Sequence, residues 1–517
     1  MSQACDQLSA PREAPTKPDC PGGRQVILIL GAVFVLYLLT YLLWWRKVPV
    51  LDVDSQSYQD MARDLSHGRL DQPSIRTPGY PLLLLALGST QNPTKALVVT
   101  GLILHFLVLG MVVAMLRKCR VPPLVVVFAS VLLLLPYNVQ AAAFVMTENL
   151  TEFALAVTAC LLWWALRQKP VMAAAAAGAA IAADALIRPT YQLLWLALMA
   201  SVWLAWYLSG EGRSGLRRAS RVMGMTLLVV LVTLGGYCRY NQTHFGYFGL
   251  TYALGINLLD KTALFVERLP ESFEPLRSAL IRHRNAALIE DQYHTAGQYP
   301  WQGRHWEELK TELGKDDVSL AKDLARANMV LIFKHPLNYL SSVVQAAATL
   351  LFPYVTTFVS GGSVMAQTLW SALHFLTMAT FLVQLCFVLG RELWTLSLRW
   401  SGCPVESYED DYNWRLAYFL SLAIVMYTIA ISAMADEGNP RYRSPADPLL
   451  LMNTALGVSF WWHRFRAARR TEQENPNHSG HSEGDRTGWP GTWSPKPTKR
   501  LEVTETQTGL VGPPGDR

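Results

Sequence analysis

The apolar stretch VILILGAVFVLYLLTYLLWW, residues 26–45, decides the class of fold that this chain adopts. A helix needs about 20 apolar residues to cross a bilayer, and this stretch has that length. It ends on Trp44 and Trp45 and is followed by Arg46 and Lys47, an aromatic and basic border typical of a membrane interface. Because a polar tail precedes it and no small-residue cleavage site follows it, we expect a membrane helix rather than a signal peptide.

Further apolar stretches predict an all-α polytopic membrane protein with about 10–12 transmembrane helices and a small, mostly helical external domain. The sequence is 51% hydrophobic, which fits a membrane protein better than a soluble enzyme. The candidate stretches after the first span are 79–116, 123–141, 149–166, 171–187, 190–208, 221–240, 337–357, 365–390, 413–434 and 445–462.

Basic connections set the expected orientation. Those near residues 117–120, 167–169 and 213–221 fall on the side of the N-terminal tail, and by the positive-inside rule that side is cytoplasmic. A basic run at 463–470 likewise predicts a cytoplasmic C-terminus. Counting every stretch as a crossing gives an odd number, which conflicts with two cytoplasmic termini. We expect 337–357 to be the stretch that does not cross fully. The prediction is a multi-pass protein of the plasma (inner) membrane.

These patterns divide the chain into five parts. The large polar insertion is rich in His, Trp and Tyr, and it lies on the outer, periplasmic or luminal, face of the expected topology. The parts are a disordered tail at 1–24, an N-terminal transmembrane module at 25–240 with a first external loop at 46–78, an external domain at 241–335, a C-terminal transmembrane module at 336–462, and a disordered tail at 463–517.

Charge and cysteine usage exclude some classes of function. The net charge is +6 and sits in short basic clusters beside apolar stretches, so it reports orientation and lipid contact rather than nucleic-acid binding. No spacing of the seven cysteines resembles a zinc site, and the insertion contains none. His283, His294 and His305 recur every eleven residues, but Gly and Pro interrupt any single helix there. We interpret this spacing as coincidence and predict no metal site.

The first external loop carries two acids at the membrane boundary. It reads LDVDSQSY at 51–58 and RTPGYP at 76–81. Residues 55–67 place their apolar side chains on one helical stripe, which predicts a short helix on the membrane surface. Asp54 stands directly before this helix. It can be an N-cap, a catalytic group at the interface, or both.

Ionisable side chains gather at the outer ends of the expected spans, where lipid disfavours them unless they have a partner or a purpose. The structural alternatives are a local salt bridge for Asp184 and Arg188 and snorkelling for the arginines near the last span. Acids and arginines at one interface are also the groups that activate a hydroxyl and hold a phosphate. The four sets are Asp52 with Asp54, Glu148 with Glu152, Asp184 with Arg188, and Glu437 with Arg441 and Arg443.

The order and spacing of several short motifs resemble the C-type integral-membrane glycosyltransferases, from about residue 26 to 462. The similarity is to bacterial relatives of the protein O-mannosyltransferase and aminoarabinose transferase (family 39-like) group. The motifs are Asp54-Ser55-x-x-Tyr58-x-x-x-Ala62, Arg76-Thr77-Pro78-Gly79-Tyr80-Pro81, Met146-Thr147-Glu148, Leu186-Ile187-Arg188-Pro189 and Arg441-Tyr442-Arg443-x-Pro445-x-x-Pro448.

This resemblance implies an inverting hexosyl- or pentosyltransferase that moves a sugar from a polyprenyl-phosphate carrier to an acceptor hydroxyl on the outer face. Asp54 would be the general base with Asp52 beside it. Many relatives carry an Asp-Glu pair where this chain has Asp54-Ser55, which leaves Asp52 as the second acid. The donor phosphate would contact Arg441, Arg188, Arg76 and Arg443, and the acceptor or sugar would be oriented by Glu148, Tyr58, Tyr80 and Glu437.

The expected partners are the lipid-linked sugar donor, membrane lipid, and an acceptor that is a glycan, a lipid or a protein. The sequence shows no required cofactor and leaves a divalent metal open. A transporter or flippase is the main alternative, because polytopic proteins with buried charges often move solutes. A membrane acyltransferase or lipid scaffold is a second alternative; for acyl transfer only His105 and His374 lie deep enough in spans.

Overall fold

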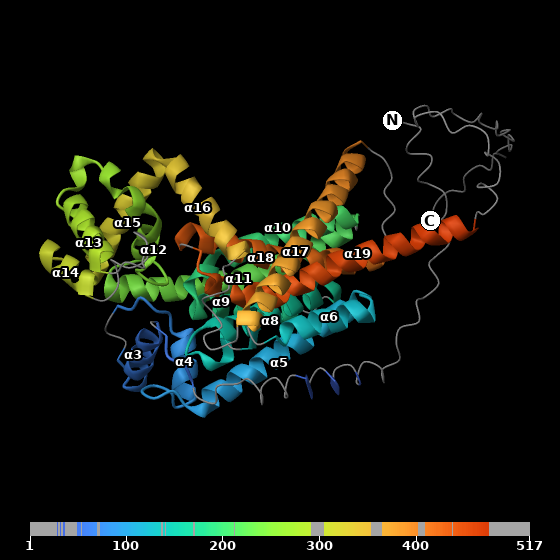
Figure 1. Cartoon of the computed structure of the whole chain (residues 1–517), viewed down its shortest axis with the longest axis horizontal. Helices are drawn as coiled ribbons and strands as arrows, with labels where there is room; N and C mark the ends of the chain where they lie inside the picture. Colours follow the sequence, from blue (N-terminus) through green and yellow to red (C-terminus); the bar gives the residue numbers. More distant parts are fainter. Residues whose placement is uncertain are drawn as a thin grey trace, which may run out of the picture. The chain divides into compact units, whose positions relative to one another are not determined.

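The computed structural model describes residues 49–52, 54–69, 73–135, 138–139, 141–168, 171–210, 212–290, 304–352, 364–401, 409–436 and 438–474, with single positions between 28 and 36 (Figure 1). Most of the expected first span, Glu437, His294 and the tails at 1–24 and 475–517 lie outside these residues. Contacts between residues divide the chain into two units, residues 1–462 and residues 463–517, and each unit is described separately.

Regular structure in the described residues of the first unit is helical, and their one strand-like contact is a parallel bridge between Val50 and Phe144. Among the described residues, six helices are long and apolar enough to cross a membrane, which confirms the predicted all-α, multi-pass fold. They are α5 (Lys95–Lys118), α8 (Glu148–Gln168), α10 (Leu194–Ser209, entered through η2, Pro189–Leu193), α11 (Gly212–Phe245), α17 (Val364–Trp400) and α18 (Glu409–Ala435).

Shorter apolar helices complete the bundle. Two of them are α6 (Pro123–Leu133) and α9 (Val171–Ile187). The stretch expected at 123–141 therefore forms a helix of only 11 residues. Pro136 follows it in the sequence, and the residue before a proline disfavours the helical conformation. The stretch expected at 337–357 is α16 (Pro336–Leu351), also too short to count among the six, so its partial crossing stays a prediction.

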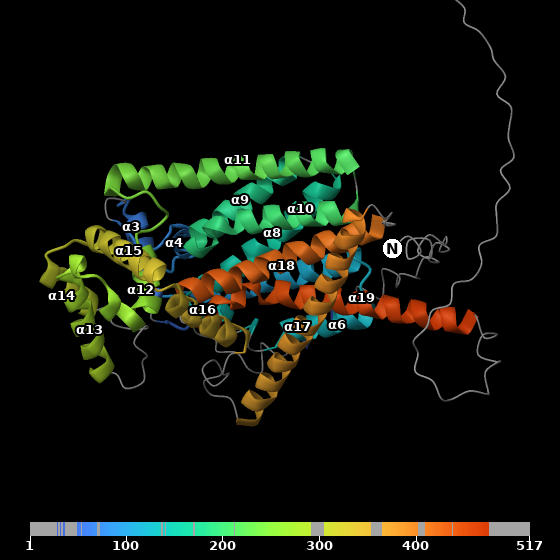
Figure 2. The same cartoon turned by 90° about the horizontal axis from the view of Figure 1, so that it is seen from above.

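The core of the bundle is built on α8, which packs against α5 and α9, while α9 packs against α11 and α10 against α18 (Figure 2). The alanines of α9 allow this closeness, because small side chains let helix backbones approach each other in a membrane. The ends of α8 and α9 are thereby held beside each other, and both carry residues of the candidate site.

A separate helical layer follows α11. It consists of α12 (Leu254–Thr262), η3 (Ala263–Arg268), η4 (Glu271–Phe273), α13 (Leu276–Glu290), α14 (Arg304–Leu313) and α15 (Asp317–Lys334). These helices share their own apolar core, with Leu259, Val266, Leu280, Leu309 and Leu324 buried together. The described part of the predicted external domain at 241–335 is therefore helical, and its division from the bundle stays a prediction. It lies at the end of the bundle where α3 (Ser55–Ser66) and α4 (Gly79–Ala86) also lie (Figures 1 and 2).

The last helix, α19 (Asp447–Glu474), runs past the boundary of the first unit. In the second unit, the described residues 463–474 are helical, so the disorder predicted from residue 463 is wrong for this part. The segment is rich in Arg, Ala and Glu, which are good helix formers. The prediction of disorder considered the basic composition of this segment and not its helix propensity.

Candidate active site

The first loop is fixed to the beginning of α8 by backbone pairing. The Val50 amide donates to the Ala143 carbonyl at 2.7 Å, and the Val145 amide donates to the Val50 carbonyl at 3.0 Å. The Ser55 hydroxyl adds a buried hydrogen bond to the Val145 carbonyl at 2.9 Å. These contacts place Asp52 and Asp54 just ahead of the first turn of α8.

Asp54 precedes α3 but does not cap it. The helix covers Ser55–Ser66, as the apolar stripe predicted, and its N-cap residue makes no side-chain capping hydrogen bond. The Asp54 carboxylate instead accepts from Arg76 Nη2 at 2.6 Å and, through its other oxygen, from Arg441 Nη2. The capping alternative left open by the sequence is therefore wrong, and Asp54 is held by two cations.

Arg441 is the centre of the site because it reaches three carboxylates. Its Nη1 donates to Asp52 Oδ2 at 3.0 Å, its Nη2 donates to Asp54 Oδ2, and its Nε lies 3.2 Å from Glu148 Oε1. The first loop and the last one are nearly 390 residues apart in the sequence at this contact (a separation of 389 for Asp52). The predicted meeting of acids from the first loop with an arginine from the last loop is confirmed.

Two further arginines complete the arrangement. Arg76 lies 4.5 Å over the Tyr58 ring, and its Nε donates to the Ser57 hydroxyl at 2.8 Å. Arg188 follows α9 and lies 3.8 Å from Glu148, the buried first residue of α8. We call the six charged residues the charge cluster: Asp52, Asp54, Arg76, Glu148, Arg188 and Arg441.

Two glycines allow the backbone to deliver these side chains. A Cβ on Gly79, in the first turn of α4, would lie 2.7 Å from the Leu186 carbonyl, so only glycine lets α4 pack onto the end of α9. Gly438 has a φ of +94°, and a Cβ there would lie 2.5 Å from the Ala346 carbonyl of α16. The loop that carries Arg441 can thus press against α16 in a left-handed conformation that favours glycine.

The charges of the cluster are balanced, three carboxylates against three guanidinium groups. Burial alone would raise the pKa of Asp54, but the neighbouring Arg76 and Arg441 overcome this and lower it to about 2. The pKa of Arg441 is reduced by burial and raised more strongly by Glu148, Tyr442 and Asp54, so that it lies above its ordinary value. Asp54 is therefore ionised at neutral pH.

Tyrosine rings line the cluster. Tyr58 and Tyr80 meet edge to face with centroids 5.2 Å apart, and both are buried. Tyr442 was not predicted as a site residue, and its ring lies under Arg188 at 4.7 Å and Arg441 at 5.3 Å. Its position in the quoted Arg441-Tyr442-Arg443 motif was the available signal. A cation over an aromatic face is attracted to it, so Tyr442 interacts favourably with both arginines.

A small cavity adjoins the cluster. Glu148 and Glu152 line it together, with Asn138, Ser444 and Pro448. The two glutamates share a face of α8, as their spacing predicted, but Glu152 turns to His105 at 2.8 Å.

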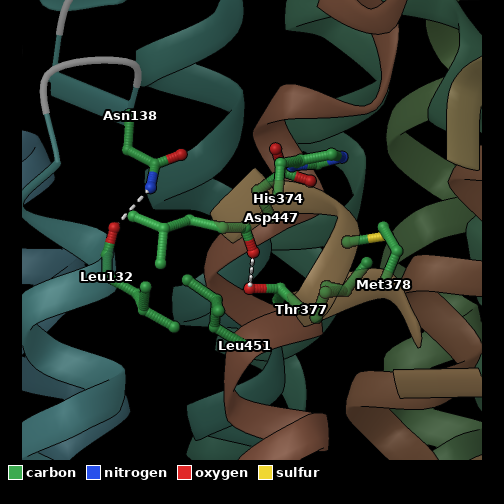
Figure 3. A pocket seen from close by; sticks show the side chains of 9 residues that line it. Leu132, Asn138, His374, Thr377, Met378, Asp447 and Leu451 are labelled. Carbon is green, nitrogen blue, oxygen red and sulfur yellow. Dashed lines mark hydrogen bonds between the residues drawn. The ribbon is translucent and has the colours of Figure 1, made fainter. Parts of the chain in front are cut away.

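A second pocket lies between α6, α17 and α19. Apolar side chains make up most of its lining, and His374 and Asp447 also line it (Figure 3). None of the six cluster residues lines it. Arg443 reaches the same Asp447 at 2.8 Å and donates to the Leu350 carbonyl. Because Arg443 is fully buried in this ion pair, the structure does not bring it to the charge cluster.

The remaining predicted residues are placed as follows. Glu437 lies outside the described residues. The ion pair formed by Arg188 is with Glu148, whereas Asp184 is contacted through its backbone carbonyl by the Arg188 amide. In place of the local salt bridge expected between Asp184 and Arg188, Arg188 forms an ion pair with Glu148 of α8.

Fold and site together define a multi-pass, all-helical membrane protein with a charge cluster where several helices begin or end. No protein-family model matches the sequence, and no curated protein matches it. The chain is similar to the archaeal oligosaccharyltransferase AglB from Archaeoglobus fulgidus in complex with an inhibitory peptide and a dolichol-phosphate. Identity is 13% and the TM-score 0.47, over 90% of this chain and 53% of the other. The chain thus spans about half the length of that protein.

Two other solved structures are similar. Arabinosyltransferase EmbB from Mycobacterium smegmatis shares 15% identity at a TM-score of 0.31, over 84% of this chain and 44% of its own. ArnT from Cupriavidus metallidurans, bound to undecaprenyl phosphate, shares 13% identity at a TM-score of 0.31, over 85% and 78%. Such low sequence identity does not establish an activity, so the functional conclusion rests on the charge cluster.

Proposed function

We propose that this protein is an inverting glycosyltransferase that moves a sugar from a polyprenyl-phosphate carrier to an acceptor hydroxyl. The observation that carries the proposal is the contact of Arg441 with Asp52, Asp54 and Glu148 at the helix ends. It puts a base and phosphate-binding cations within a few ångströms of each other. The order of the quoted motifs along the chain supports the same class of reaction.

Asp54 is the proposed general base. It removes the proton from the acceptor hydroxyl as the oxygen attacks the anomeric carbon, and the bond from that carbon to the phosphate oxygen breaks with its electron pair on the phosphate. With a pKa of about 2, Asp54 is a weak base while both arginines face it. When Arg441 turns to a donor phosphate, Asp54 loses one cation and its pKa rises, which makes it a better base.

Arg441, Arg76 and Arg188 are the proposed contacts of the donor phosphate. A guanidinium group binds phosphate oxygens through paired N–H donors and stabilises the negative charge that develops as the phosphate departs. Asp52 keeps Arg441 in position at 3.0 Å. Glu148, Tyr58 and Tyr80 are proposed to orient the sugar or the acceptor.

No resident metal is proposed at this site. Asp52, Asp54 and Glu148 all lie against guanidinium groups, which already supply the positive charge that the leaving group needs. We therefore expect transfer to continue after chelation with EDTA, at a rate within about twofold of the untreated protein. A loss of activity that added Mg²⁺ or Mn²⁺ restores would assign a metal to the reaction.

The site is proposed to face the outside of the plasma (inner) membrane, with both termini cytoplasmic. Basic connections at one end of the spans support this orientation by the positive-inside rule. The charge cluster and the small helical domain lie at the other end, so the acceptor, whether glycan, lipid or protein, would approach from the external side.

The test is transfer by purified protein in liposomes. Radiolabelled polyprenyl-phosphate sugars are supplied with membrane extract, and the labelled product is identified. Asp54→Asn should lower the rate by about 100-fold or more, because a positioned base contributes that much. Asp64→Asn, an acid on the same helix α3 that pairs with Arg69, is the matched control and should keep the wild-type rate. Equal labelling by wild type and Asp54→Asn, or movement of lipid or solute without transfer, would overturn the proposal.

A further inference from the structure

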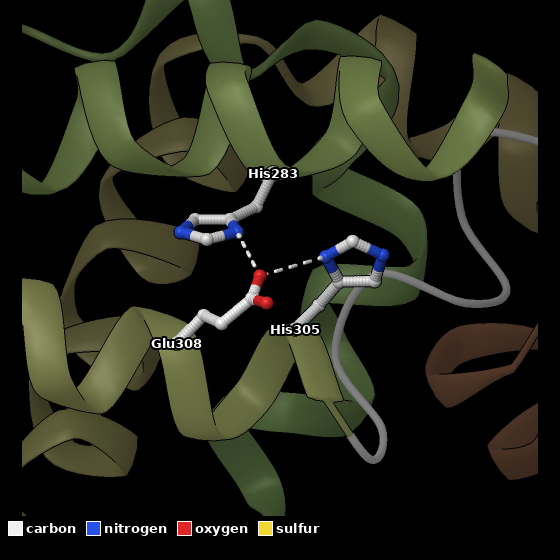
Figure 4. Close-up of side chains that lie close together, drawn as sticks. All are labelled: His283, His305 and Glu308. Atoms are coloured by element: carbon white, nitrogen blue, oxygen red, sulfur yellow. Dashed lines mark ion pairs between the residues drawn. The ribbon is translucent and has the colours of Figure 1, made fainter. Parts of the chain in front are cut away.

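Two histidines and a glutamate converge in the small helical domain, on elements separate from the charge cluster. His283 is on α13, and His305 and Glu308 are on α14 (Figure 4). Nδ1 of His283 lies 3.8 Å from Glu308 Oε2, and Nδ1 of His305 lies 3.6 Å from the same oxygen. Figure 4 shows both rings turned toward this carboxylate from opposite sides.

The separations suit a metal ion. Zn²⁺ binds His nitrogen at about 2.0–2.1 Å and carboxylate oxygen at about 2.0–2.2 Å, usually in a tetrahedron, so its ligand atoms lie about 3.3–3.5 Å apart. The three candidate ligand atoms lie within 4.8 Å of one another. A metal ion could therefore bind after side-chain shifts of about 1 Å or less. The histidine side chains are 12% and 11% exposed, so their positions are already set by packing.

A second, independent contact supports the same interpretation. The other nitrogen of His283, Nε2, lies 3.1 Å from Glu312 Oε2, and Glu312 is itself held by Arg282. Histidines that bind metals commonly donate their second ring N–H to a carboxylate, which fixes the tautomer and directs the free lone pair at the metal. Here that arrangement leaves Nδ1 of His283 directed at Glu308 and His305.

We propose that His283, His305 and Glu308 form a binding site for a divalent transition-metal ion of the Zn²⁺ type, with Glu312 as its outer carboxylate. Two imidazoles and one carboxylate are a ligand set that such ions accept, with water in the remaining position. Glu308 is 46% exposed, which gives the ion a route from solvent. The bound ion would join α13 to α14.

This assignment is distinct from the proposed transfer site. The charge cluster contains no histidine, and its carboxylates lie against arginines. The eleven-residue spacing of His283, His294 and His305, interpreted above as coincidence, brings the first and third together. His294 lies outside the described residues and is not part of the proposed site.

The test measures metal content of the purified full chain, carrying a tag without histidines. After chelator treatment the protein is titrated with Zn²⁺ and separated from free metal. The amount of bound zinc per protein is then measured by elemental mass spectrometry. Wild type should bind one equivalent that His283→Ala and His305→Ala lose. His244→Ala, an exposed histidine of α11, should keep it. Equal stoichiometry in wild type and both substituted proteins would overturn the proposal, leaving only histidine–glutamate ion pairs.

A second pair of variants tests the outer carboxylate. Glu312→Gln should keep the equivalent but weaken Zn²⁺ binding by about 10–100-fold, as changes behind a ligating histidine do. Glu271→Gln, an exposed acid of η4, should bind as wild type does. Should the histidine variants fail to fold, Co²⁺ added to wild type decides: visible absorption bands typical of a tetrahedral site support the assignment, and the weak spectrum of the hydrated ion refutes it.

Discussion

Arg441 and Arg443 stand two residues apart on one connection, and the structure uses them in opposite ways. Arg443 is fully buried and forms a one-to-one ion pair with Asp447, four residues later at the start of α19. Arg441 is 14% exposed and is shared by acids from the first loop and from α8. One guanidinium closes a local pair, and the other joins segments that are distant in the sequence.

The difference separates a structural charge from one that can act on a ligand. Removing either partner of the buried Arg443–Asp447 pair leaves an uncompensated charge. In the charge cluster two of the three carboxylates have an alternative cation, since Asp54 contacts Arg76 and Arg441 and Glu148 contacts Arg188 and Arg441. Arg441 can therefore release one acid for a phosphate while that acid keeps a partner.

The largest effect that tests this comparison is on the rate of transfer. Arg441→Lys should lower it by about 100–1,000-fold, the usual loss when one group that stabilises developing charge is removed. Lysine keeps the charge, but its compact ammonium cannot present the fork of donors that faces three carboxylates. Transfer from the lipid-linked sugar is the measurement, with thermal stability in detergent recorded beside it. If Arg441→Lys retains the wild-type rate, Arg441 is no more a ligand-binding group than Arg443.

Some parts of this site could be predicted from the sequence and others could not, and the physical reason differs from residue to residue. Asp54 and Arg441 were predicted to meet because both lie at the outer ends of expected spans, where lone charges are costly, and because the family resemblance assigns them to one site. The separate fate of Arg443 was not predictable, since residues two apart face different directions in a turn and the sequence does not show which side is buried. Tyr442 and Gly438 act through tertiary contacts with Arg188 and Ala346, which no local pattern reveals.

The fold was predictable to a similar degree. Long apolar stretches gave the helices, because a bilayer requires their length and satisfied backbone. The ends were less certain: α6 ends at Leu133 and α19 continues to Glu474. The meeting of His283 with His305 depends on how α13 packs against α14, and the spacing of the histidines alone could not show it.

The second prediction addresses stability. Arg443→Met alone should destabilise the protein by about 3–5 kcal/mol, because Asp447 is then buried without its cation. The double variant Arg443→Met/Asp447→Leu should recover most of that loss, since a buried ion pair can often be replaced by apolar side chains at little cost. Thermal unfolding in detergent measures both, and transfer by the double variant should stay within about threefold of wild type.

The outcome for the double variant is informative in either direction. Recovery of stability with full transfer confirms that Arg443 and Asp447 are structural. Recovery of stability with transfer reduced 100-fold or more would return Arg443 to the donor phosphate site that the sequence analysis assigned to it, and would remove the contrast with Arg441.

The smallest expected effect is on the pH dependence of the reaction. Asp54 accepts a proton only while ionised, so activity falls as pH decreases through its pKa, which is lowered to about 2 by Arg76 and Arg441. The profile of kcat/KM reports the free enzyme and should therefore show no acid limb from Asp54 above about pH 4. The profile of kcat reports the complex, in which Arg441 faces the donor phosphate, and its acid limb should lie about one pH unit or more higher.

Two arginine variants test the origin of this limb. Arg76→Gln removes the other cation and should shift the acid limb of kcat/KM to higher pH as well. Arg69→Gln should not, because Arg69 pairs with Asp64 on α3. Identical limbs for kcat and kcat/KM would mean that Arg441 does not leave Asp54 when the donor binds, and the proposed exchange between acid and phosphate would be wrong.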